Sequence, residues 1–350
     1  MKKLIIQIPC FNEAETLGIA LAALPRQVSG FDRVEWLIID DGCTDGTVDV
    51  ALAHGVDHLV RLSGHQGLAK GFLAGIDACL AAGADVIVNT DADNQYCADD
   101  IPALVGPVLE GKADIVIGAR PIEQIDHFSP IKKALQRLGS AVVRMASNTD
   151  VRDAPSGFRA ISREAAMRLH VFGNYTYTIE TIIQAGQKGM RILSVPIRTN
   201  GDLRPSRLVK SIPRYVVRSV STIARIFVTY RPLRLFLPLA IVIFLAGMGL
   251  GLRYLYFLAI GQGAGHIQSV ILAAALLGTG TFIFLIGVLA DLISTNRKLL
   301  EQIDWKLRQV QEVVRVGTRP AEPQVVIDQR GLSKRLEARS PAGAKARRKS

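Results

Sequence analysis

The chain has 350 residues, of which 49% are hydrophobic, and a formal net charge of +11. This length leaves room for one large α/β domain and further segments, and the basic excess favours an anionic partner. Nucleic acid and an anionic membrane surface are the alternatives, and the neighbouring apolar segments favour the membrane. The four cysteines show no metal-ligand spacing and no pairing, which indicates reduced thiols of a cytosolic domain.

Short apolar runs alternate with helical patterns through the first 120 residues. The predicted strands are 4–8, broken by Pro9, then 36–39, 58–62, 86–88 and 114–118. The predicted helices between them are 13–24, 66–82 and 100–109. This alternation predicts an α/β fold with a Rossmann-like, mostly parallel sheet and helices on both faces. Only a strand-length apolar run follows the two amino-terminal lysines, so we expect no signal peptide.

Two carboxylates and an amide follow the apolar run 86–88, at Asp91, Asp93 and Gln95. Ligands of parallel sheets bind beyond the carboxyl ends of the strands. Oxygen donors at this spacing suit Mg²⁺ or Mn²⁺ together with substrate phosphates. A solvated turn is the alternative, because Asp and Asn are common in loops. The position after a buried strand favours the metal site.

Two common nucleotide-binding loops are excluded. Residues 64–70 resemble a Walker loop only loosely, because Ala69 stands before Lys70 and Gly71 after it. The first strand is not followed by Gly-x-Gly-x-x-Gly either.

Four motifs resemble those of family 2 glycosyltransferases and occur in the family's order. They are Pro-Cys-Phe-Asn-Glu at 9–13, Asp-Asp-Gly-Cys-Thr-Asp-Gly-Thr at 40–47, Asp-Ala-Asp-Asn-Gln at 91–95 and Ser-Gly-Phe-Arg at 156–159. Within this family the chain is most similar to polyprenyl-phosphate sugar synthases, the group that contains dolichyl-phosphate mannose synthase. The resemblance covers roughly residues 3–210 and implies a glycosyltransferase A-type fold.

The resemblance implies that the loop after the first strand holds the nucleotide, through Pro9, Phe11 and Glu13. Glu13 would accept hydrogen bonds from the ribose, and Asp41, with Asp40 beside it, would read the base. An ordinary first-turn acid, favoured by the helix dipole, is the alternative for Glu13.

The resemblance also implies that Asp91, Asp93 and Gln95 hold a metal that bridges the donor diphosphate, so that Asp91 belongs to the nucleotide site as well. The metal would neutralise charge on the departing nucleoside diphosphate. Arg120 ends the next strand and could add a fixed guanidinium to the same charge. A structural salt bridge is the alternative for Arg120.

Asp153 matches the family's acceptor-side aspartate. Because a phosphate monoester is largely dianionic above its second pKa of about 6, we expect Asp153 to orient the acceptor or Arg159 rather than act as a base. Arg159 and Arg163 are expected to lie one helical turn apart and clamp phosphate oxygens, with solvated helix charge as the alternative. Weaker candidates for the acceptor phosphate are Arg204, Arg207 and Lys210.

Two apolar segments are long enough to cross a bilayer: 235–252, with hydrophobicity resuming through 260, and 267–290, which contains no charge. A pair of buried soluble helices is the alternative. The connection 261–266 lacks Lys and Arg while both outer flanks are basic, which predicts a two-pass protein of the inner or plasma membrane with both ends in the cytoplasm. The predicted division of the chain is a catalytic domain at 1–207, interfacial amphipathic helices at 208–232, two transmembrane helices at 233–293, a charged, self-associating cytoplasmic helix at 294–316 and a basic disordered tail at 317–350.

The sequence therefore predicts a membrane-anchored, metal-dependent, inverting glycosyltransferase that moves a sugar from a UDP- or GDP-linked donor to polyprenyl phosphate (undecaprenyl phosphate in bacteria) for cell-envelope glycan synthesis. A processive polysaccharide synthase is one alternative, but neither Trp36 nor Trp305 lies in its Gln-x-x-Arg-Trp motif. A non-catalytic scaffold that binds nucleotide sugar is the other. We expect the bilayer and a homo-oligomer such as a tetramer as partners, and no nucleic acid. Residues 65–67 and 121–129 depart from the mannose-synthase pattern, so mannose, glucose and N-acetylglucosamine all stay open.

Overall fold

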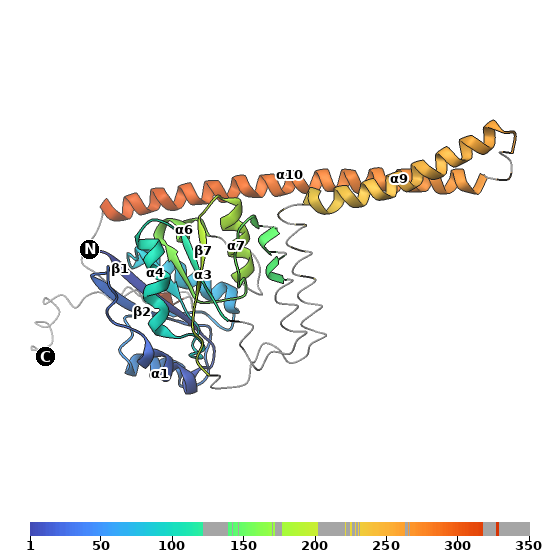
Figure 1. Cartoon of the computed structure of the whole chain (residues 1–350). Coiled ribbons are helices and arrows are strands. Elements are labelled where there is room, and N and C mark those ends of the chain that lie inside the picture. Colours follow the sequence, from blue (N-terminus) through green and yellow to red (C-terminus); the bar gives the residue numbers. More distant parts are fainter. Residues whose placement is uncertain are drawn as a thin grey trace, which may run out of the picture. The chain divides into compact units, whose positions relative to one another are not determined.

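The computed structural model describes residues 1–121, 139–169 except 142 and 146, 171, 177–201, 232–262 and 267–317, with a few single residues between these ranges and the pair 327–328. The chain forms two compact units, Met1–Ile212 with Leu307–Ser350, called the sheet unit, and Pro213–Lys306, called the hairpin unit. The elements of the sheet unit (Figure 1) are β1 (Lys3–Cys10), α1 (Ala14–Ala23), β2 (Arg33–Asp40), α2 (Thr47–Ala53), β3 (His58–Arg61), α3 (Leu68–Ala81), β4 (Val86–Asn89), the short 3-10 helix η1 (Ala98–Asp100), α4 (Ile101–Leu109), β5 (Ile115–Ala119), β6 (Arg159–Ser162), α6 (Arg163–Arg168), α7 (Thr178–Gln187), β7 (Ile192–Pro196) and β8 (Ile327–Asp328).

The sheet has the strand order β7-β5-β6-β4-β1-β2-β3-β8. All neighbouring strands are parallel except β6, which runs antiparallel between β4 and β5. The predicted mostly parallel α/β fold is therefore confirmed. The central strands β1 and β4 are buried along almost their whole length, as strands covered on both faces must be.

Helices cover both faces because alternate residues of each strand point to opposite sides. On one face, Leu4, Ile6 and Ile8 of β1 belong to the same buried cluster as residues of α1 and α4. On the other face α3 packs closely on Gln7 of the same strand. A Cβ atom at Gly75 in α3 would lie 2.5 Å from Oε1 of Gln7, so only glycine permits this approach.

The first strand does not stop at Pro9 as the sequence predicted, but continues to Cys10. Pro9 pairs with Ile39 of β2, whereas the ladder between β1 and β4 ends at Gln7. The backbone N–H and C=O groups of residues 7 and 9 point toward β4 rather than β2. Because the ladder between β1 and β4 has ended before residue 9, the N–H that Pro9 lacks would have had no partner in the sheet.

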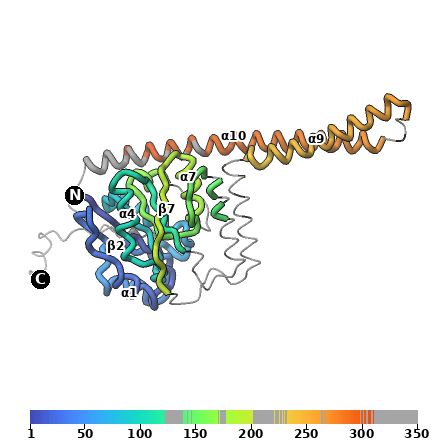
Figure 2. The backbone as a smooth tube through the Cα atoms, viewed as in Figure 1, coloured from blue at the N-terminus to red at the C-terminus, as the bar shows by residue number. Residues whose placement is uncertain are grey.

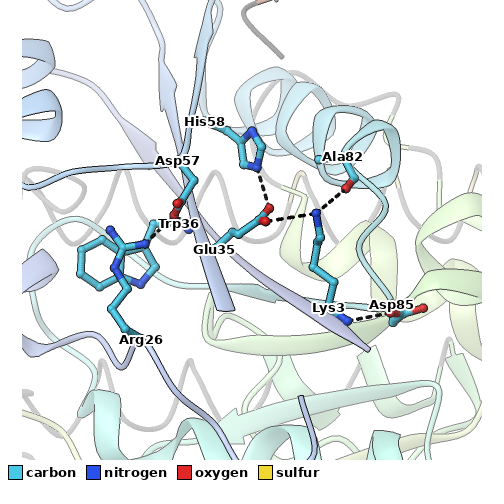
Figure 3. A network of polar contacts seen from close by, with 8 residues as sticks. All are labelled: Lys3, Arg26, Glu35, Trp36, Asp57, His58, Ala82 and Asp85. Atoms are coloured by element: carbon cyan, nitrogen blue, oxygen red, sulfur yellow. Dashed lines mark hydrogen bonds and ion pairs between the residues drawn. The ribbon is translucent and has the colours of Figure 1, made fainter. Parts of the chain in front are cut away.

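A polar network holds the amino ends of β1 to β3, at the edge opposite the predicted site (Figure 3). Glu35 lies 3.0 Å from Nζ of Lys3 and 2.8 Å from Nε2 of His58. Burial raises the pKa of Glu35, but the hydrogen bonds from His58 and Lys3 outweigh it and hold the pKa below its ordinary value. The backbone N–H of Lys3 also donates to Asp85 at 2.7 Å. This network therefore ties three strands and the turn before β4 together.

The hairpin unit consists mainly of α9 (Pro232–Ala259) and most of α10 (Ile267–Gly317), which lie side by side (Figure 2). Both helices have a stretch long and apolar enough to cross a membrane, with mean hydropathy of 2.5 over an 18-residue window in Pro232–Ala259 and 2.3 over such a window in Ile267–Arg297. Small residues let the two backbones approach, since a Cβ atom at Gly247 would lie 2.9 Å from the backbone nitrogen of Leu277. The predicted second membrane segment and the predicted charged helix at 294–316 form one continuous helix, α10.

Candidate active site

The carboxyl ends of neighbouring strands bring the predicted motifs together. Cys10 lies opposite Asp40 in the ladder between β1 and β2, and Gln7 lies opposite Asn89 in the ladder between β1 and β4. β5 lies one strand beyond β4, with β6 between them. Because parallel strands end at the same edge of a sheet, the loops that follow them start close together. The predicted nucleotide and metal motifs therefore share this edge.

Asp41 fixes the loop that follows β3. The buried carboxylate accepts hydrogen bonds from the backbone N–H of Gln66 at 2.7 Å and of Gly67 at 2.9 Å. One oxygen also lies 2.9 Å from Nδ1 of His65. Both carboxylate oxygens are thus engaged within the protein, and Asp41 shapes the loop beside the predicted base position.

An aromatic pair stands at the same loop. The ring of Phe11 stacks on the imidazole of His65, with centroids 3.8 Å apart and an interplanar angle of 27°. Phe11 is 38% exposed and so presents apolar surface to which a flat base can bind. In the sequence, His65 was noted only because it departs from the family pattern.

Asp40, the other acid predicted beside the base, is buried and accepts a hydrogen bond from the backbone N–H of Cys43 at 2.7 Å.

Glu13 joins the first loop to the next helix. Its backbone N–H donates to Oγ1 of Thr47 at 2.8 Å, and its carboxylate accepts from Oγ1 of Thr16 at 3.1 Å. It directly precedes α1, where a carboxylate also interacts favourably with the helix dipole. The position of Glu13 is compatible with both roles considered for it, a hydrogen-bond acceptor for the ribose and an acid that stabilises the first turn of the helix.

Asp91 and Asp93 form a half-buried acidic pair directly after β4. Burial, followed by the negative charge of Asp93, raises the pKa of Asp91 to about 7, while the positive charge of Arg120 and a hydrogen bond from Tyr96 act in the opposite direction. The backbone N–H of Gln95 donates to Asp93 at 3.1 Å and fixes its carboxylate.

This donor set fits a divalent cation. Two carboxylates that repel each other would be relieved by a positive ion, and the side-chain amide of Gln95 adds a neutral oxygen. Among the described residues, no group of three or more His, Cys, Asp or Glu could by itself hold a metal ion. A cation at Asp91 and Asp93 would therefore need further oxygens from a phosphate-bearing ligand, which is how Mg²⁺ usually binds.

Gly157 lies directly against the side chain of Asp91. A Cβ atom at this position would lie 3.1 Å from Oδ1 of Asp91 and 3.1 Å from the hydroxyl of Tyr177. The Gly157 backbone is held from both sides, since its N–H donates to the Tyr96 hydroxyl at 3.0 Å and its carbonyl accepts from Nδ2 of Asn89 at 2.9 Å. Asn89 also donates to Tyr177 at 2.9 Å. Tyr177 is fully buried and its ring stacks on Phe72 of α3, so it packs inside the domain.

Arg120, directly after β5, is paired with Asp153. Its Nε lies 2.7 Å from Oδ2 and its Nη2 lies 3.1 Å from Oδ1, so both carboxylate oxygens are engaged. Burial lowers the pKa of Arg120, but the neighbouring Tyr96, Asp153 and Asp91 outweigh it and raise the pKa, so the guanidinium stays charged. Asp153 therefore orients Arg120, a contact that the sequence did not predict.

The expectation that Arg159 and Arg163 lie one helical turn apart is wrong. Arg159 lies in the antiparallel strand β6, and Arg163 begins the helix that follows. Arg159 is buried and donates to the carbonyls of Ser156 and Ala154 and to Oγ1 of Thr181, each at 2.8 Å. Arg163 donates to a different set, the carbonyls of residues 80 and 84. Both guanidiniums donate to groups of the protein itself, in loops and in helices α3 and α7.

Three predicted residues remain, and all of them lie outside the described part of the chain: Arg204, Arg207 and Lys210. The site residues that sequence reasoning missed are Asn89, Tyr96 and Gly157. Asn89 and Tyr96 flank the acidic motif directly, and their polar groups next to a buried strand were the available signal.

Two family models match the chain. Residues 5–169 match glycosyl transferase family 2, and residues 231–295 match the GtrB C-terminal hairpin. An uncharacterized glycosyltransferase of Mycobacterium bovis is 31% identical over 208 residues, which are 57% of this chain and 88% of the relative. The undecaprenyl-phosphate mannosyltransferase of Micrococcus luteus is 28% identical over 54% of this chain and 80% of its own length. The polyprenol monophosphomannose synthase of Mycolicibacterium smegmatis is 27% identical over 56% and 77%.

Solved structures share the fold. Glucosyl-3-phosphoglycerate synthase from Mycobacterium tuberculosis, in complex with phosphoglyceric acid, superposes with a TM-score of 0.51 at 22% identity. The superposition covers 63% of this chain and 80% of that one. The same synthase in complex with Mn²⁺, UDP and glucosyl-3-phosphoglycerate superposes with a TM-score of 0.50 at 21% identity.

The mostly parallel sheet and its matches define a glycosyltransferase with an A-type fold, which carries two apolar helices near its carboxyl end. The chain belongs to glycosyl transferase family 2.

Proposed function

We propose that this glycosyltransferase transfers a sugar from a nucleotide-sugar donor to polyprenyl phosphate at the cytoplasmic face of a membrane. The observation that carries the proposal is the presence, in one chain, of an acidic strand-end site and a membrane-type helical hairpin. The phosphate of a polyprenyl phosphate lies at the bilayer surface, so an enzyme that uses this acceptor must work there, and a membrane anchor keeps it at that surface. The two relatives named for undecaprenyl-phosphate and polyprenol substrates support the same acceptor class.

A divalent ion, Mg²⁺ or Mn²⁺, would be held by Asp91, Asp93 and Gln95. Burial and the repulsion from Asp93, which together raise the pKa of Asp91, support this assignment, as does the Mn²⁺–UDP complex of the structural neighbour. When bound, the ion neutralises negative charge on the departing nucleoside diphosphate. The nucleotide base would rest against Phe11, next to the loop that Asp41 shapes.

Arg120 supplies a second, permanent positive charge. The positive charge of Arg120 lowers the pKa of Asp91, so the guanidinium acts on the predicted metal site. This supports a position of Arg120 near the donor diphosphate. Asp153 holds this guanidinium at two points, so its direction is set before substrate binds. Charge that develops on the leaving diphosphate therefore meets a group that needs no reorganisation.

In the proposed reaction an oxygen of the lipid phosphate attacks the anomeric carbon of the sugar. The bond from that carbon to the donor phosphate oxygen breaks on the opposite face, and the nucleoside diphosphate leaves with the electron pair. A single displacement inverts the anomeric configuration. The lipid phosphate is largely dianionic near neutral pH and needs no base, which agrees with the full engagement of the Asp153 oxygens by Arg120.

The test is product analysis with the purified full chain, undecaprenyl phosphate, Mn²⁺ or Mg²⁺, and a panel of UDP- and GDP-linked sugars. We expect one donor to give a lipid-linked sugar of inverted configuration by mass spectrometry and NMR, and chelator to abolish it. Asp93→Ala should lose turnover, whereas Asp99→Ala, which removes an exposed carboxylate nearby, should keep it. No lipid product with any donor, or a yield that chelator leaves unchanged, would overturn the proposal.

A further inference from the structure

The segment that follows β7 runs along the predicted metal motif. Tyr96 and Thr199 form an isolated antiparallel bridge, and the backbone N–H of Asn200 donates to the carbonyl of Gln95 at 2.9 Å. Gln95 is the last of the three predicted metal ligands, and the other two precede it in the same loop. The main chain of the metal loop is therefore bound to a segment that lies far along the sequence.

The side chain of Asn200 adds two hydrogen bonds to the same loop. Its Nδ2 donates to the carbonyl of Asn94 at 2.9 Å and to that of Tyr96 at 3.2 Å. Together with its backbone N–H, Asn200 thus contacts the carbonyls of three consecutive residues, 94–96. A carbonyl oxygen can only accept, so an amide NH₂ group, which has two donor hydrogens, satisfies both side-chain contacts at once. A carboxylate of the same shape could not, because it has no hydrogen to donate.

These carbonyls belong to the turn that connects two predicted ligands. Asn94 stands between Asp93 and Gln95 in the left-handed backbone region, with a φ of 56°. Residues other than glycine seldom adopt this region, and Asn is among those that tolerate it. The backbone N–H of Gln95 donates to the Asp93 carboxylate at 3.1 Å, and the hydroxyl of Tyr96 donates to the carboxylate of Asp91. A shift of the turn would therefore be felt at all three predicted ligands.

We propose that Asn200 is a positioning residue for the metal site, whose amide holds the turn at residues 94–96 so that Gln95 stands beside Asp91 and Asp93 before a cation binds. The inference rests on the metal site proposed above. Among the described residues, every hydrogen bond of Asn200 goes to this turn. Partners of this kind orient metal ligands, and their replacement typically costs about 10- to 100-fold in metal affinity.

The segment has other attachments that do not involve the Asn200 amide. Before it, β7 pairs with β5 along the sheet. Arg198 donates three hydrogen bonds to the carboxylate of Asp100, at 2.6, 3.0 and 2.7 Å. The carbonyl of Arg198 also accepts from the backbone N–H of Cys97 at 3.3 Å. Loss of the Asn200 amide should therefore leave the segment in place, so an effect on the metal site can be separated from unfolding.

The test is Mn²⁺ binding to the purified full chain, measured by calorimetry and by EPR spectroscopy of the bound ion. We expect Asn200→Asp to weaken binding by about 10- to 100-fold and to change the EPR spectrum, because a displaced Gln95 alters the ligand set. The added negative charge would by itself attract the cation, so simple electrostatics predicts the opposite direction. Asn200→Ala, which adds no charge, should also weaken binding. The unfolding temperature without metal should fall only slightly in both variants.

The matched control is Arg198→Ala, which removes the exposed ion pair with Asp100 on the same segment. We expect it to keep the Mn²⁺ affinity and the EPR spectrum of the natural chain. Natural affinity in both Asn200 variants would overturn the inference while the metal site itself stands. Equal losses of affinity in Arg198→Ala, or Asn200 variants that no longer fold, would also overturn it, because the amide would then serve the fold alone. A natural chain that binds no Mn²⁺ would overturn the metal site and this inference with it.

Discussion

Arg120 and Asp153 meet in a two-point ion pair although 33 positions separate them in the chain. The carboxylate also accepts the backbone N–H of Arg120 at 3.2 Å, so one side chain fixes both the main chain and the guanidinium at the end of β5. The carboxylate is 1% exposed and the guanidinium side chain 10%. The direction of the charge near Asp91 is therefore set by a residue that need not touch substrate.

Asp153→Asn should weaken both the fold and the reaction. The amide keeps the shape but leaves the guanidinium of Arg120 without its counter-charge, and breaking a buried pair costs about 3 kcal/mol or more. We expect a lower unfolding temperature and a fall in kcat of at least tenfold, measured by thermal unfolding and by turnover. Asp114→Asn is the control, since it removes an exposed pair with Arg191 and should change little. A stable and fully active Asp153→Asn enzyme would contradict the positioning role.

Metal affinity should rise with pH up to about pH 7 and then level off. The pKa of Asp91 is raised to about 7, and a protonated carboxyl cannot coordinate a cation, so affinity should fall about tenfold for each pH unit below that value. Calorimetric titration of Mn²⁺ at pH 5, 6, 7 and 8 measures the profile. An affinity that stays constant between pH 5 and 7 would count against Asp91 as a ligand.

The same raised pKa predicts how stability depends on metal. Without metal, the folded protein holds the Asp91 proton more tightly than the unfolded chain, so this contribution to stability is present at low pH and is lost as pH rises through about 7. The rise in unfolding temperature caused by Mn²⁺ should therefore be larger at pH 8 than at pH 6. An equal rise at both values would contradict the prediction.

Gly157→Ala should weaken metal binding. The new Cβ would lie 3.1 Å from Oδ1 of Asp91, closer than ordinary contact, so the carboxylate must shift. We expect at least tenfold weaker Mn²⁺ binding and a lower unfolding temperature, because the same Cβ would also lie 3.1 Å from the buried hydroxyl of Tyr177. Gly106→Ala provides the control, because a Cβ there meets nothing within 4 Å and the residue lies in helix α4. Equal metal affinities of the two variants would show that Asp91 tolerates the contact.

Local sequence patterns predicted the first five strands of the sheet, β1 to β5. The apolar runs that became β1, β2, β4 and β5 are short, buried and separated by helix patterns, which is the periodicity that parallel strands require. Strand β6 was missed because nothing local marks it. It lies antiparallel between β4 and β5, although about 40 or more residues separate it from either strand in the chain.

For the candidate site too, the sequence predicted some features and not others. The motif residues at the strand ends come together because the register of parallel strands brings them together. Partner choice was not predictable, since Asp153 contacts Arg120 and the guanidinium of Arg159 is engaged by loop carbonyls and Thr181. These pairings depend on how the segment just before β6 lies against β5 and α7. A charged residue in sequence cannot by itself be assigned to substrate or to the fold.

Arg159→Met tests that distinction directly. Burial lowers the pKa of Arg159, and its three nitrogens donate to Ser156, Ala154 and Thr181. Removal of these donors leaves buried acceptors unpaired, at about 1–3 kcal/mol for each. We expect a marked loss of thermal stability with kcat reduced and KM for the lipid phosphate nearly unchanged. Arg159→Lys should restore only part of the stability, because one ammonium cannot reach three acceptors set in a planar fork. A phosphate clamp would show the opposite split, a large rise in KM for the lipid phosphate in a protein that unfolds at its normal temperature, because a residue that binds substrate contributes little to the fold without it.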